Sequence, residues 1–455
     1  MSYAPWIRDL VVIPEVTEGT AVMPAATGGL LHSGLEFDPG RQKIESASFK
    51  NYRGGRGSIE GQRKPTGSIA WDWSPSGTAG TPPDCDDWLQ TIFSVANTTQ
   101  FTLDGSLAPT TTTATITPTG AVAAGDLIFF GVDSHVEARV VTKVSNTGGA
   151  IVWAPPLASA PSAGATIKAC RNYTLQKTPT KSCTLHEITD TAFLRAITGA
   201  WAKGLTIEFS NDGSLVKCST DFAAKDYCLG GPLTLGAAVE TTDGTTFNFA
   251  ADALAVPNET GNHVGMWYKC DNEVFKITAY DYATGNATVV RGQAGTSGAT
   301  HLIGTACLPY TPTPTVNDYP QPSIRGFVWL GDTSATDWAI VRGKLVLDEA
   351  GEQRMAALKE TPIGRVYAEN RTATLELTMI VDSTVASLIG HEWMFNTLAL
   401  IVQIGDQDGQ SLAIRIPKAE VTLSQPVDEG SEVAYNMTCR CLPTSGNDEF
   451  GLGVA

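Results

Sequence analysis

Alternating apolar and polar residues recur along the chain and predict β-strands. Successive side chains of a strand point to opposite faces, so Ile69, Trp71 and Trp73 share one face of an extended segment. The C-terminal half repeats this alternation with a second apolar set, Leu375, Leu377, Met379 and Val381. Both segments therefore predict strands with one buried face.

A helix is expected after each of these strands. Asp84 can cap the first helix, whose apolar stripe contains Trp88, Leu89, Ile92 and Phe93. Ser383 can cap the second, in which Leu388, Ile389 and Trp393 face inward. Because Trp71, Trp73 and Trp88 all fall on apolar faces, we expect them to pack in the core rather than to line a sugar site.

Each half of the chain ends in a predicted β-hairpin. Residues 205–209 and 215–218 flank an Asn-Asp-Gly turn, which is a strong hairpin signal. Residues 421–423 and 433–437 flank a wider turn around residue 429. Each half is thus predicted to contain strands, one helix and further strands, which indicates an internal duplication.

Two further segments, at about residues 102–174 and 246–311, resemble each other. Residues 136–140 match residues 274–278, and both segments close on the pattern Ala-Cys-x-x-Tyr-Thr. Their short apolar runs and glycine turns predict two small β-barrels of about six strands each. Threonine- and proline-rich stretches next to them are expected to be extended linkers.

Composition agrees with a β-rich structural protein. Only 17% of the 455 residues are charged, while 45 glycines and 25 prolines supply many turns. The formal net charge of −16 argues against tight nucleic-acid binding, because phosphate contacts require Lys and Arg. There is neither an apolar run of transmembrane length nor a signal-peptide pattern, so we expect a reducing cytoplasm and nine free thiols.

The sequence contains no motif that predicts catalysis. His391 begins a pattern like that of zinc proteases, but Phe395 occupies the place of the second histidine. Cys439 and Cys441 share one face of a strand with no second pair nearby, which favours a core position. A helix N-terminus accounts for the acidic cluster around Asp86 better than calcium binding does. We therefore predict a protein that is not an enzyme and that binds neither a cofactor nor a metal.

The order of these elements resembles the phage tail tube fold. The resemblance rests on a strand pair joined by a long polar loop, the strand at residues 64–69, one helix and a terminal hairpin. It implies a mainly β protein with two tail-tube-like β-sandwich or barrel domains, each with one helix, and two small inserted β-barrel modules. The first tube domain would comprise residues 1–99 and 175–230 and the second 312–455, with modules at 100–174 and 231–311.

The resemblance is closest to the major tail tube protein of long-tailed phages. It implies a virion subunit that polymerises into stacked rings around a channel for DNA ejection. Such rings usually contain six tube domains, so a chain with two of them would form a ring from three copies. The implied partners are other copies of the chain, a tape-measure protein, and terminator and baseplate proteins. DNA would pass without tight binding, no membrane would be involved, and assembly would take place in the host cytoplasm.

A glycine-rich basic loop is the candidate contact between rings. It contains Arg53, Gly54, Gly55 and Arg56 in an otherwise acidic chain, and acidic surface on the next ring would attract it. A solvated, mobile hairpin loop is the alternative for these residues.

A second functional interpretation is a carbohydrate-binding or adhesin-type β protein of a phage tail. It would use the small barrels and exposed aromatic residues such as Trp153, Trp267 or Tyr282. The duplicated core favours the tube subunit, because a lectin gains nothing from two embedded helices.

Overall fold

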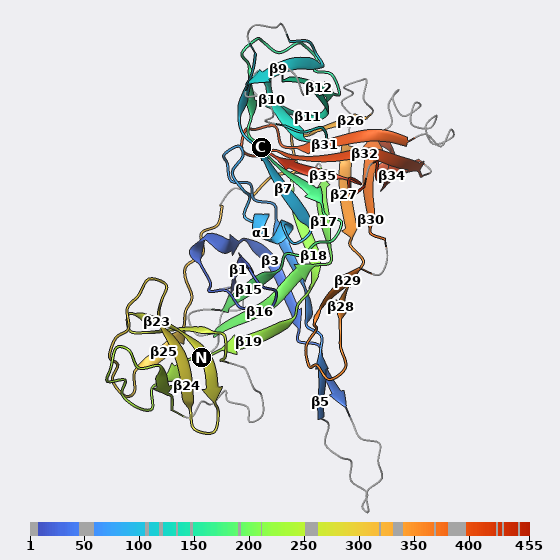
Figure 1. Ribbon diagram of the computed structural model, residues 1–455. Coiled ribbons are helices and arrows are strands. Elements are labelled where there is room, and N and C mark those ends of the chain that lie inside the picture. Colours follow the sequence, from blue (N-terminus) through green and yellow to red (C-terminus); the bar gives the residue numbers. More distant parts are fainter. Residues whose placement is uncertain are drawn as a thin grey trace, which may run out of the picture.

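The computed structural model shows a protein built almost entirely from β-strands (Figure 1), which is the predicted fold class. Its only α-helix among the described residues is α1 (Asp86–Leu89), and Ala26–Gly28 form a 3-10 turn. The structure describes residues 8–44, 59–104, 109–117, 122–132, 135–145, 149–189, 193–210, 212–250, 263–317, 320–330, 340–367, 370–380, 397–424, 426–429, 432–444 and 446–455.

Nineteen strands form one large sheet system with contributions from both halves of the chain. The first half supplies β1 (Arg8–Pro14), β2 (Gly29–Leu30), β3 (His32–Asp38), β6 (Thr66–Asp72), β15 (Cys183–Thr189), β16 (Phe193–Ala202), β17 (Gly204–Ser210), β18 (Lys217–Ala223) and β19 (Asp226–Gly230). The second half supplies β26 (Phe327–Leu330), β27 (Ile340–Asp348), β30 (Thr372–Ile380), β31 (Thr397–Ile404), β32 (Leu412–Leu423), β33 (Val427–Glu429), β34 (Glu432–Cys441) and β35 (Gly451–Val454). The two remaining strands are β7 (Phe93–Thr98) and β14 (Cys170–Leu175).

Two smaller units, which we name the barrel module and the second module, lie at opposite ends of the molecule (Figure 1). The barrel module is a closed barrel of β8 (Phe101–Leu103), β9 (Thr113–Thr117), β10 (Leu127–Val132), β11 (His135–Val144), β12 (Ala150–Ala154) and β13 (Thr166–Lys168). The second module is a sheet of β20 (Leu233–Thr234), β21 (Thr246–Asn248), β22 (Trp267–Cys270), β23 (Glu273–Asp281), β24 (Asn286–Gln293) and β25 (Ala306–Pro309).

Both modules contain six strands as predicted, but only the barrel module is a closed barrel, whereas the second module is an open sheet. In the second module a single bridge between Leu235 and Phe249 links the outer strands. The shared Ala-Cys segment also has different partners in the two modules. Cys307 lies in β25 of the second module, whereas Cys170 lies in β14, which leaves the barrel and pairs with β7 and β35.

The two halves repeat the same order of strand pairing. In the first half β3 pairs with β6, β6 with β18, and β18 with β17. In the second half β27 pairs with β30, β30 with β34, and β34 with β32 and β33. A further series β1, β15, β16 and β19 has its counterpart in β26, β31, β32 and β35. The duplication is therefore present in the hydrogen-bonding pattern.

Two register shifts fall at equivalent places in the two halves. β3 slips against β6 at Gly34, and β27 slips against β30 at Arg342. An extra residue in β16 precedes Ala200, and an extra residue in β32 precedes Ala419. Because such bulges fix the local register, they align the halves residue by residue. Gly34 corresponds to Arg342, and Ala200 corresponds to Ala419.

The barrel module packs on the second half of the chain, and the second module packs on the first half. The barrel module is inserted in the first half, yet its Phe129 shares a buried cluster with Trp329 of the second half. The second module packs on the first half, where Tyr268 shares a buried cluster with Val11. Val11 and Trp329 occupy corresponding positions, so the two modules cover equivalent faces.

The first helix is much shorter than predicted. Phe93, expected on its apolar stripe, begins β7 instead, because β7 finds a strand partner in β14. The predicted cap at Asp84 is wrong, since its carboxylate accepts the backbone N–H of Asn317 and Cys85 precedes the helix without a side-chain cap. The second predicted helix lies outside the described residues.

All nine cysteines are buried free thiols, as expected. Burial raises the pKa of most of them, including Cys228 to about 12, which leaves them unreactive. In the part of the chain that the structure describes, no helix has the length and apolar character needed to cross a membrane.

Candidate assembly surface

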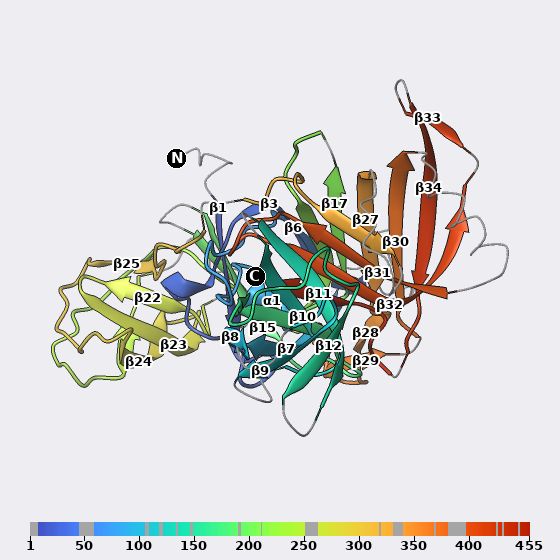
Figure 2. The same ribbon diagram turned by 90° about the horizontal axis from the view of Figure 1, so that it is seen from above.

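The repeated strand series of the two halves pair directly at β17 with β27, an antiparallel pair that we call the joint, and β14 makes a second link by pairing with both β7 and β35. Its register runs from Gly204 opposite Asp348 to Ser210 opposite Arg342. Figure 2 shows the strands of the second half continuing the sheet of the first across it. The joint is part of the main core, because both strands bury apolar residues there: Leu205, Ile207, Leu345 and Leu347. Two repeats thus form one continuous sheet.

Glycines allow the strands of the joint to approach each other closely. A Cβ atom on Gly204 would collide with the carbonyl oxygen of Leu347. A Cβ atom on Gly343 would collide with the ring of Phe209. A side chain at either position would therefore force its neighbour in the joint to move.

The sheet face that points away from the core carries charges of alternating sign. Across five neighbouring strands the register aligns one row of residues, Asp72, Lys217, Glu208, Lys344 and Glu376. Lys344 Nζ lies 2.7 Å from Glu208 Oε1 across the joint, and this hydrogen bond raises the pKa of Lys344. Opposite charges on directly opposed residues favour the observed register.

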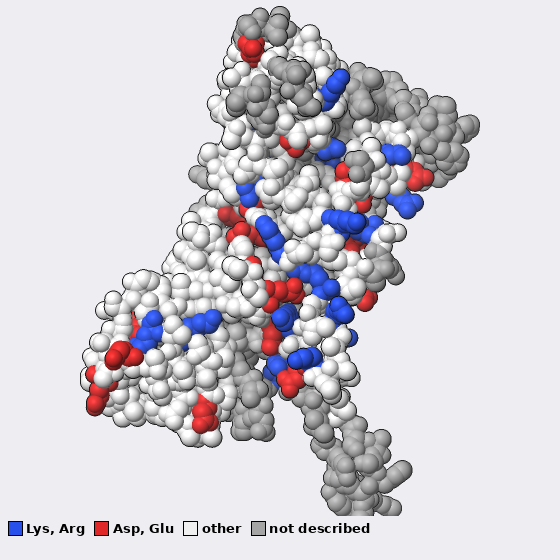
Figure 3. All heavy atoms as spheres, viewed as in Figure 1, with Lys and Arg blue, Asp and Glu red and all other residues white. Residues whose placement is uncertain are grey.

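Carboxylates outnumber basic groups on this exposed face. Its acidic residues are Glu36, Asp38, Asp72, Glu208, Asp221, Asp348, Glu376 and Glu420, and its basic residues are Lys203, Lys217, Arg342, Lys344 and Arg440. Two open grooves hollow it, one beside Lys344 and the other beside Asp221. Figure 3 shows basic and acidic side chains interspersed down the middle of the molecule. The face is polar with an excess of negative charge, and it offers no single basic strip for a phosphate backbone.

Both ends of the repeated strand order are open edges among the described residues. β3 pairs with β6 on one side, and no described strand follows its other side. At the opposite end β33 has β34 as its only described partner strand. Because β3 corresponds to β27, and β32 with β33 corresponds to β17, the open edges are equivalent to the two edges that meet in the joint. Open edges of this kind recruit strands from other chains.

Two ribbons project side by side from one end of the sheet (Figure 1), one from each half. β4 (Arg41–Ile44) and β5 (Ile59–Arg63) connect β3 to β6, and β28 (Gly351–Arg354) and β29 (Gly364–Tyr367) connect β27 to β30. The backbone N–H of Arg63 donates to the carbonyl of Glu360 at 2.7 Å, which holds the ribbons together. The candidate loop residues Arg53, Gly54, Gly55 and Arg56 come between β4 and β5 and lie outside the described residues.

The tryptophans that the sequence assigned to the core lie there. Trp71, Trp73 and Trp88 are each 1% exposed, and Trp88 packs edge-on against Phe222 with ring centroids 6.1 Å apart. The expectation that Trp153 and Trp267 are exposed, on which the adhesin interpretation relied, is wrong. Trp153 fills the interior of the barrel against Phe130, and Trp267 is buried where the second module meets the first half, whereas Tyr282 is half-buried.

A buried ion pair attaches α1 to the large sheet. Arg171 donates from Nε and Nη2 to the two carboxylate oxygens of Asp86, at 2.6 Å each, and the Tyr173 hydroxyl donates to Asp86 Oδ1 at 2.7 Å. The sequence predicts a helix terminus at Asp86 but carries no sign of this partner, because Arg171 lies in a strand far along the chain. The cluster has all its polar atoms engaged, so its role is structural.

One family model matches the chain. A model described as phage tail tube protein matches residues 8–261, which is more than half of the length. The match covers the large-sheet strands of the first half and the whole barrel module. No curated protein matches the chain.

Proposed function

The chain belongs to the phage tail tube protein family, and from this premise we propose that it polymerises into the tail tube of a long-tailed phage. Its role is structural, as a component of the virion, rather than enzymatic. The observation that carries the proposal is the joint, which already pairs two repeats edge to edge within one chain.

Rings form when the open β3 edge of one copy pairs with the open β32 and β33 edge of the next. This contact is head-to-tail. Head-to-tail contacts close into a ring when the rotation from one copy to the next divides a full turn evenly. Six repeats per ring would come from three chains, with each interchain contact equivalent to the joint. Closure removes every exposed sheet edge.

The alignment of the halves gives the register of the interchain contact. When the alignment of the halves is extended across the sheet, Glu36 of β3 corresponds to Lys344 of β27. Val427 of β33 corresponds to Glu208 of β17. Val427 of one copy should therefore lie directly opposite Glu36 of the next copy. The nearby Glu429 would lie opposite Gly34.

The exposed sheet face would line the channel. The opposite face is covered by the main core and, further out, by the two modules, which leaves the charged face as the inner wall. Its excess of carboxylates repels DNA phosphates, so a duplex can pass without binding. The modules would then lie on the tail exterior.

The paired ribbons would face the neighbouring ring. They project from one end of the sheet, and Arg53 and Arg56 are carried by the β4–β5 connection. We assign residues 1–99 with 175–230, and 312–455, to the two tube domains. The proposed partners are other copies of the chain, a tape-measure protein, and terminator and baseplate proteins, with assembly in the host cytoplasm.

Cysteine cross-linking tests the proposed edge. In a Glu36→Cys, Val427→Cys double variant, mild oxidation of assembled protein should produce covalent dimers and trimers. A ladder that stops at three chains gives the number per ring, and negative-stain electron microscopy of the same sample should show rings or tubes with a central hole. The background is low because every native cysteine is buried.

The two single-cysteine variants are the matched controls and should remain monomeric on a denaturing gel. Tubes without cross-links would refute the β3 to β33 contact while leaving the tube function standing. Particles that stay dispersed even with a tape-measure partner would argue against the function itself. Tubes formed by an Arg53→Glu, Arg56→Glu variant would exclude the proposed contact between rings.

A further inference from the structure

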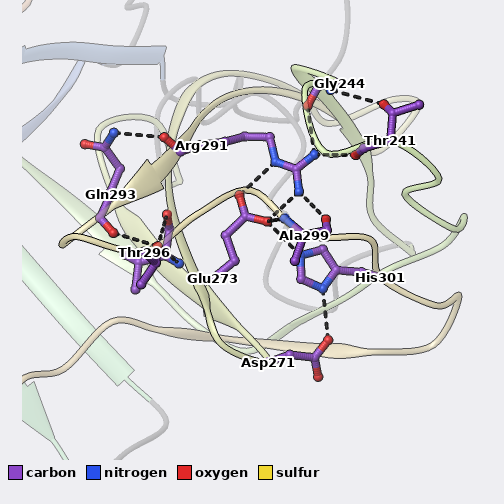
Figure 4. A network of polar contacts seen from close by, with 10 residues as sticks. Thr241, Gly244, Asp271, Glu273, Arg291, Gln293, Thr296, Ala299 and His301 are labelled. Carbon is purple, nitrogen blue, oxygen red and sulfur yellow. Dashed lines mark hydrogen bonds and ion pairs between the residues drawn. The ribbon is translucent and has the colours of Figure 1, made fainter.

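Side chains that commonly bind metals gather at the turn between β22 and β23, and Figure 4 shows two of them, Asp271 and His301. A sulfur of Cys270, a carboxylate oxygen of Asp271 and a ring nitrogen of His301 all lie within 4.8 Å of one another. Cys270 is fully buried and His301 is 2% exposed, whereas the Asp271 side chain is 59% exposed. The cluster is thus anchored in the core of the second module and reaches solvent on one side.

We propose that this cluster is a zinc site, with Cys270, Asp271 and His301 as its ligands and a water molecule from the exposed side in the fourth position. Cys307 lies directly opposite Cys270 in the neighbouring strand β25, but its sulfur is not among the ligand atoms that gather within 4.8 Å. One thiolate sulfur, one imidazole nitrogen and one carboxylate oxygen are ligands that Zn²⁺ takes together with a water molecule in four-coordinate sites.

His301 is oriented as a metal-binding histidine is. Its Nε2 lies 2.9 Å from Glu273 Oε2, and a carboxylate at this position fixes the ring and leaves Nδ1 for the metal. Glu273 is itself held by Arg291, whose Nε lies 2.7 Å from Oε1, and by the N–H of Ala299 at 2.9 Å from Oε2. All three residues are visible around the ring in Figure 4.

The contact between His301 and Asp271 needs a positive species. His301 Nδ1 lies 2.9 Å from Asp271 Oδ2. When Nε2 carries the hydrogen that Glu273 accepts, Nδ1 presents a lone pair to a carboxylate, which is repulsive unless a proton or a cation lies there. A zinc ion bound to Cys270, Asp271 and His301 would supply this positive charge.

The site would join two segments of the second module. Cys270 ends β22 and Asp271 follows it in the β22–β23 turn, whereas His301 comes from the connection between β24 and β25. A metal bound here would clip that connection to the sheet. No sequence pattern predicts this site, because no paired Cys-x-x-Cys spacing is present and His301 lies 30 residues from Asp271.

Cobalt binding tests the proposal on the full-length chain, purified with excess phosphine reductant and stripped with a chelator. Tetrahedral Co²⁺ with thiolate ligands gives a near-ultraviolet charge-transfer band and strong visible bands. We expect one Co²⁺ per chain, displacement of these bands by one equivalent of Zn²⁺, and a higher melting temperature with Zn²⁺. Reduced wild-type protein that shows no such bands overturns the proposal, whatever the variants do.

Variants locate the site. Cys270→Ala should remove the charge-transfer band, whereas Cys228→Ala, at a buried cysteine of the same core cluster, should leave it unchanged. Glu273→Gln should lower the Co²⁺ affinity by about 10–100-fold, because the orienting carboxylate is lost. A band that survives both Cys270→Ala and His301→Gln places the metal elsewhere and overturns the assignment.

Discussion

Replacing Gln403 with leucine tests how the barrel module is held on the second half. Gln403 lies in β31 and is 1% exposed. Its Oε1 accepts the N–H of Ala138 at 2.7 Å, and its Nε2 donates to the carbonyl oxygens of Val136 and Gly405, at 2.8 Å each. Two of these three bonds reach β11 of the barrel module. The corresponding residue of the first half is Ile188.

The expected loss in the free energy of unfolding follows from the buried backbone groups that lose their hydrogen-bond partner. Leucine has nearly the same size but no polar atoms, so three buried backbone groups are left unsatisfied, at about 1–3 kcal/mol each. Burial of the more apolar side chain offsets about 2 kcal/mol. Because the barrel module can shift and let water reach its two groups, we expect a net destabilisation of about 2–4 kcal/mol, concentrated at the contact between the barrel module and the second half.

Hydrogen exchange measured by mass spectrometry is the appropriate assay. The variant should lose protection in β10, β11 and β31 while the joint strands β17 and β27 keep theirs. Gln407→Leu is the matched control, since Gln407 is exposed and its side chain donates to the Asp406 carboxylate rather than to the barrel module. Unchanged protection in β11, with unchanged melting, would refute the idea that Gln403 docks the barrel module.

Three further predictions concern stability. Asp86→Asn leaves the buried Arg171 guanidinium without a charged partner and should cost about 3 kcal/mol in urea unfolding, more than the nearby Asp87→Asn control; equal costs would contradict the ion-pair argument. Burial, opposed by a hydrogen bond to the Val22 carbonyl, lowers the pKa of His186 to about 4. The unfolded histidine titrates near 6.5, so acid favours the unfolded state, and stability should fall by up to about 3 kcal/mol between pH 6.5 and 4. This fall should be reduced in His186→Gln, and an identical pH profile would exclude His186 as the cause. Gly343→Val should force the joint strands apart and lower the melting temperature, with a cost of about 1–3 kcal/mol; a neutral result would show that the joint tolerates a side chain.

Local patterns predicted the elements of this protein better than their partners. The shared face of Ile69, Trp71 and Trp73 is buried, and so are Leu375 and Leu377, because strand alternation is set by neighbours in sequence. Both predicted hairpins are confirmed by their registers, since their turns are short. The first helix was overestimated because its pattern does not reveal that Phe93 has a strand partner in β14.

Contacts between distant segments were not predictable in the same way. The joint depends on which sheet edges remain open after each half has folded, and the role of Gly204 there is a matter of close approach rather than of turn formation. The pairing of Arg171 with Asp86 and the gathering of Cys270 with His301 likewise depend on the tertiary fold. Sequence spacing carries no signal for either.

The joint also changes the thermodynamics of building a tube. In the proposed ring of three chains, half of the lateral contacts form within a chain during folding. Their formation is not opposed by a loss of translational and rotational freedom. That loss is about 4–15 kcal/mol for each bimolecular association. A covalent tether replaces it with an effective concentration in the millimolar range for short flexible links, so the second repeat is already in place when the first one folds. Covalent linkage would also fix the circumferential order of the two unlike modules, giving the tail exterior a strict threefold alternation that six separate subunits could reach only by sorting.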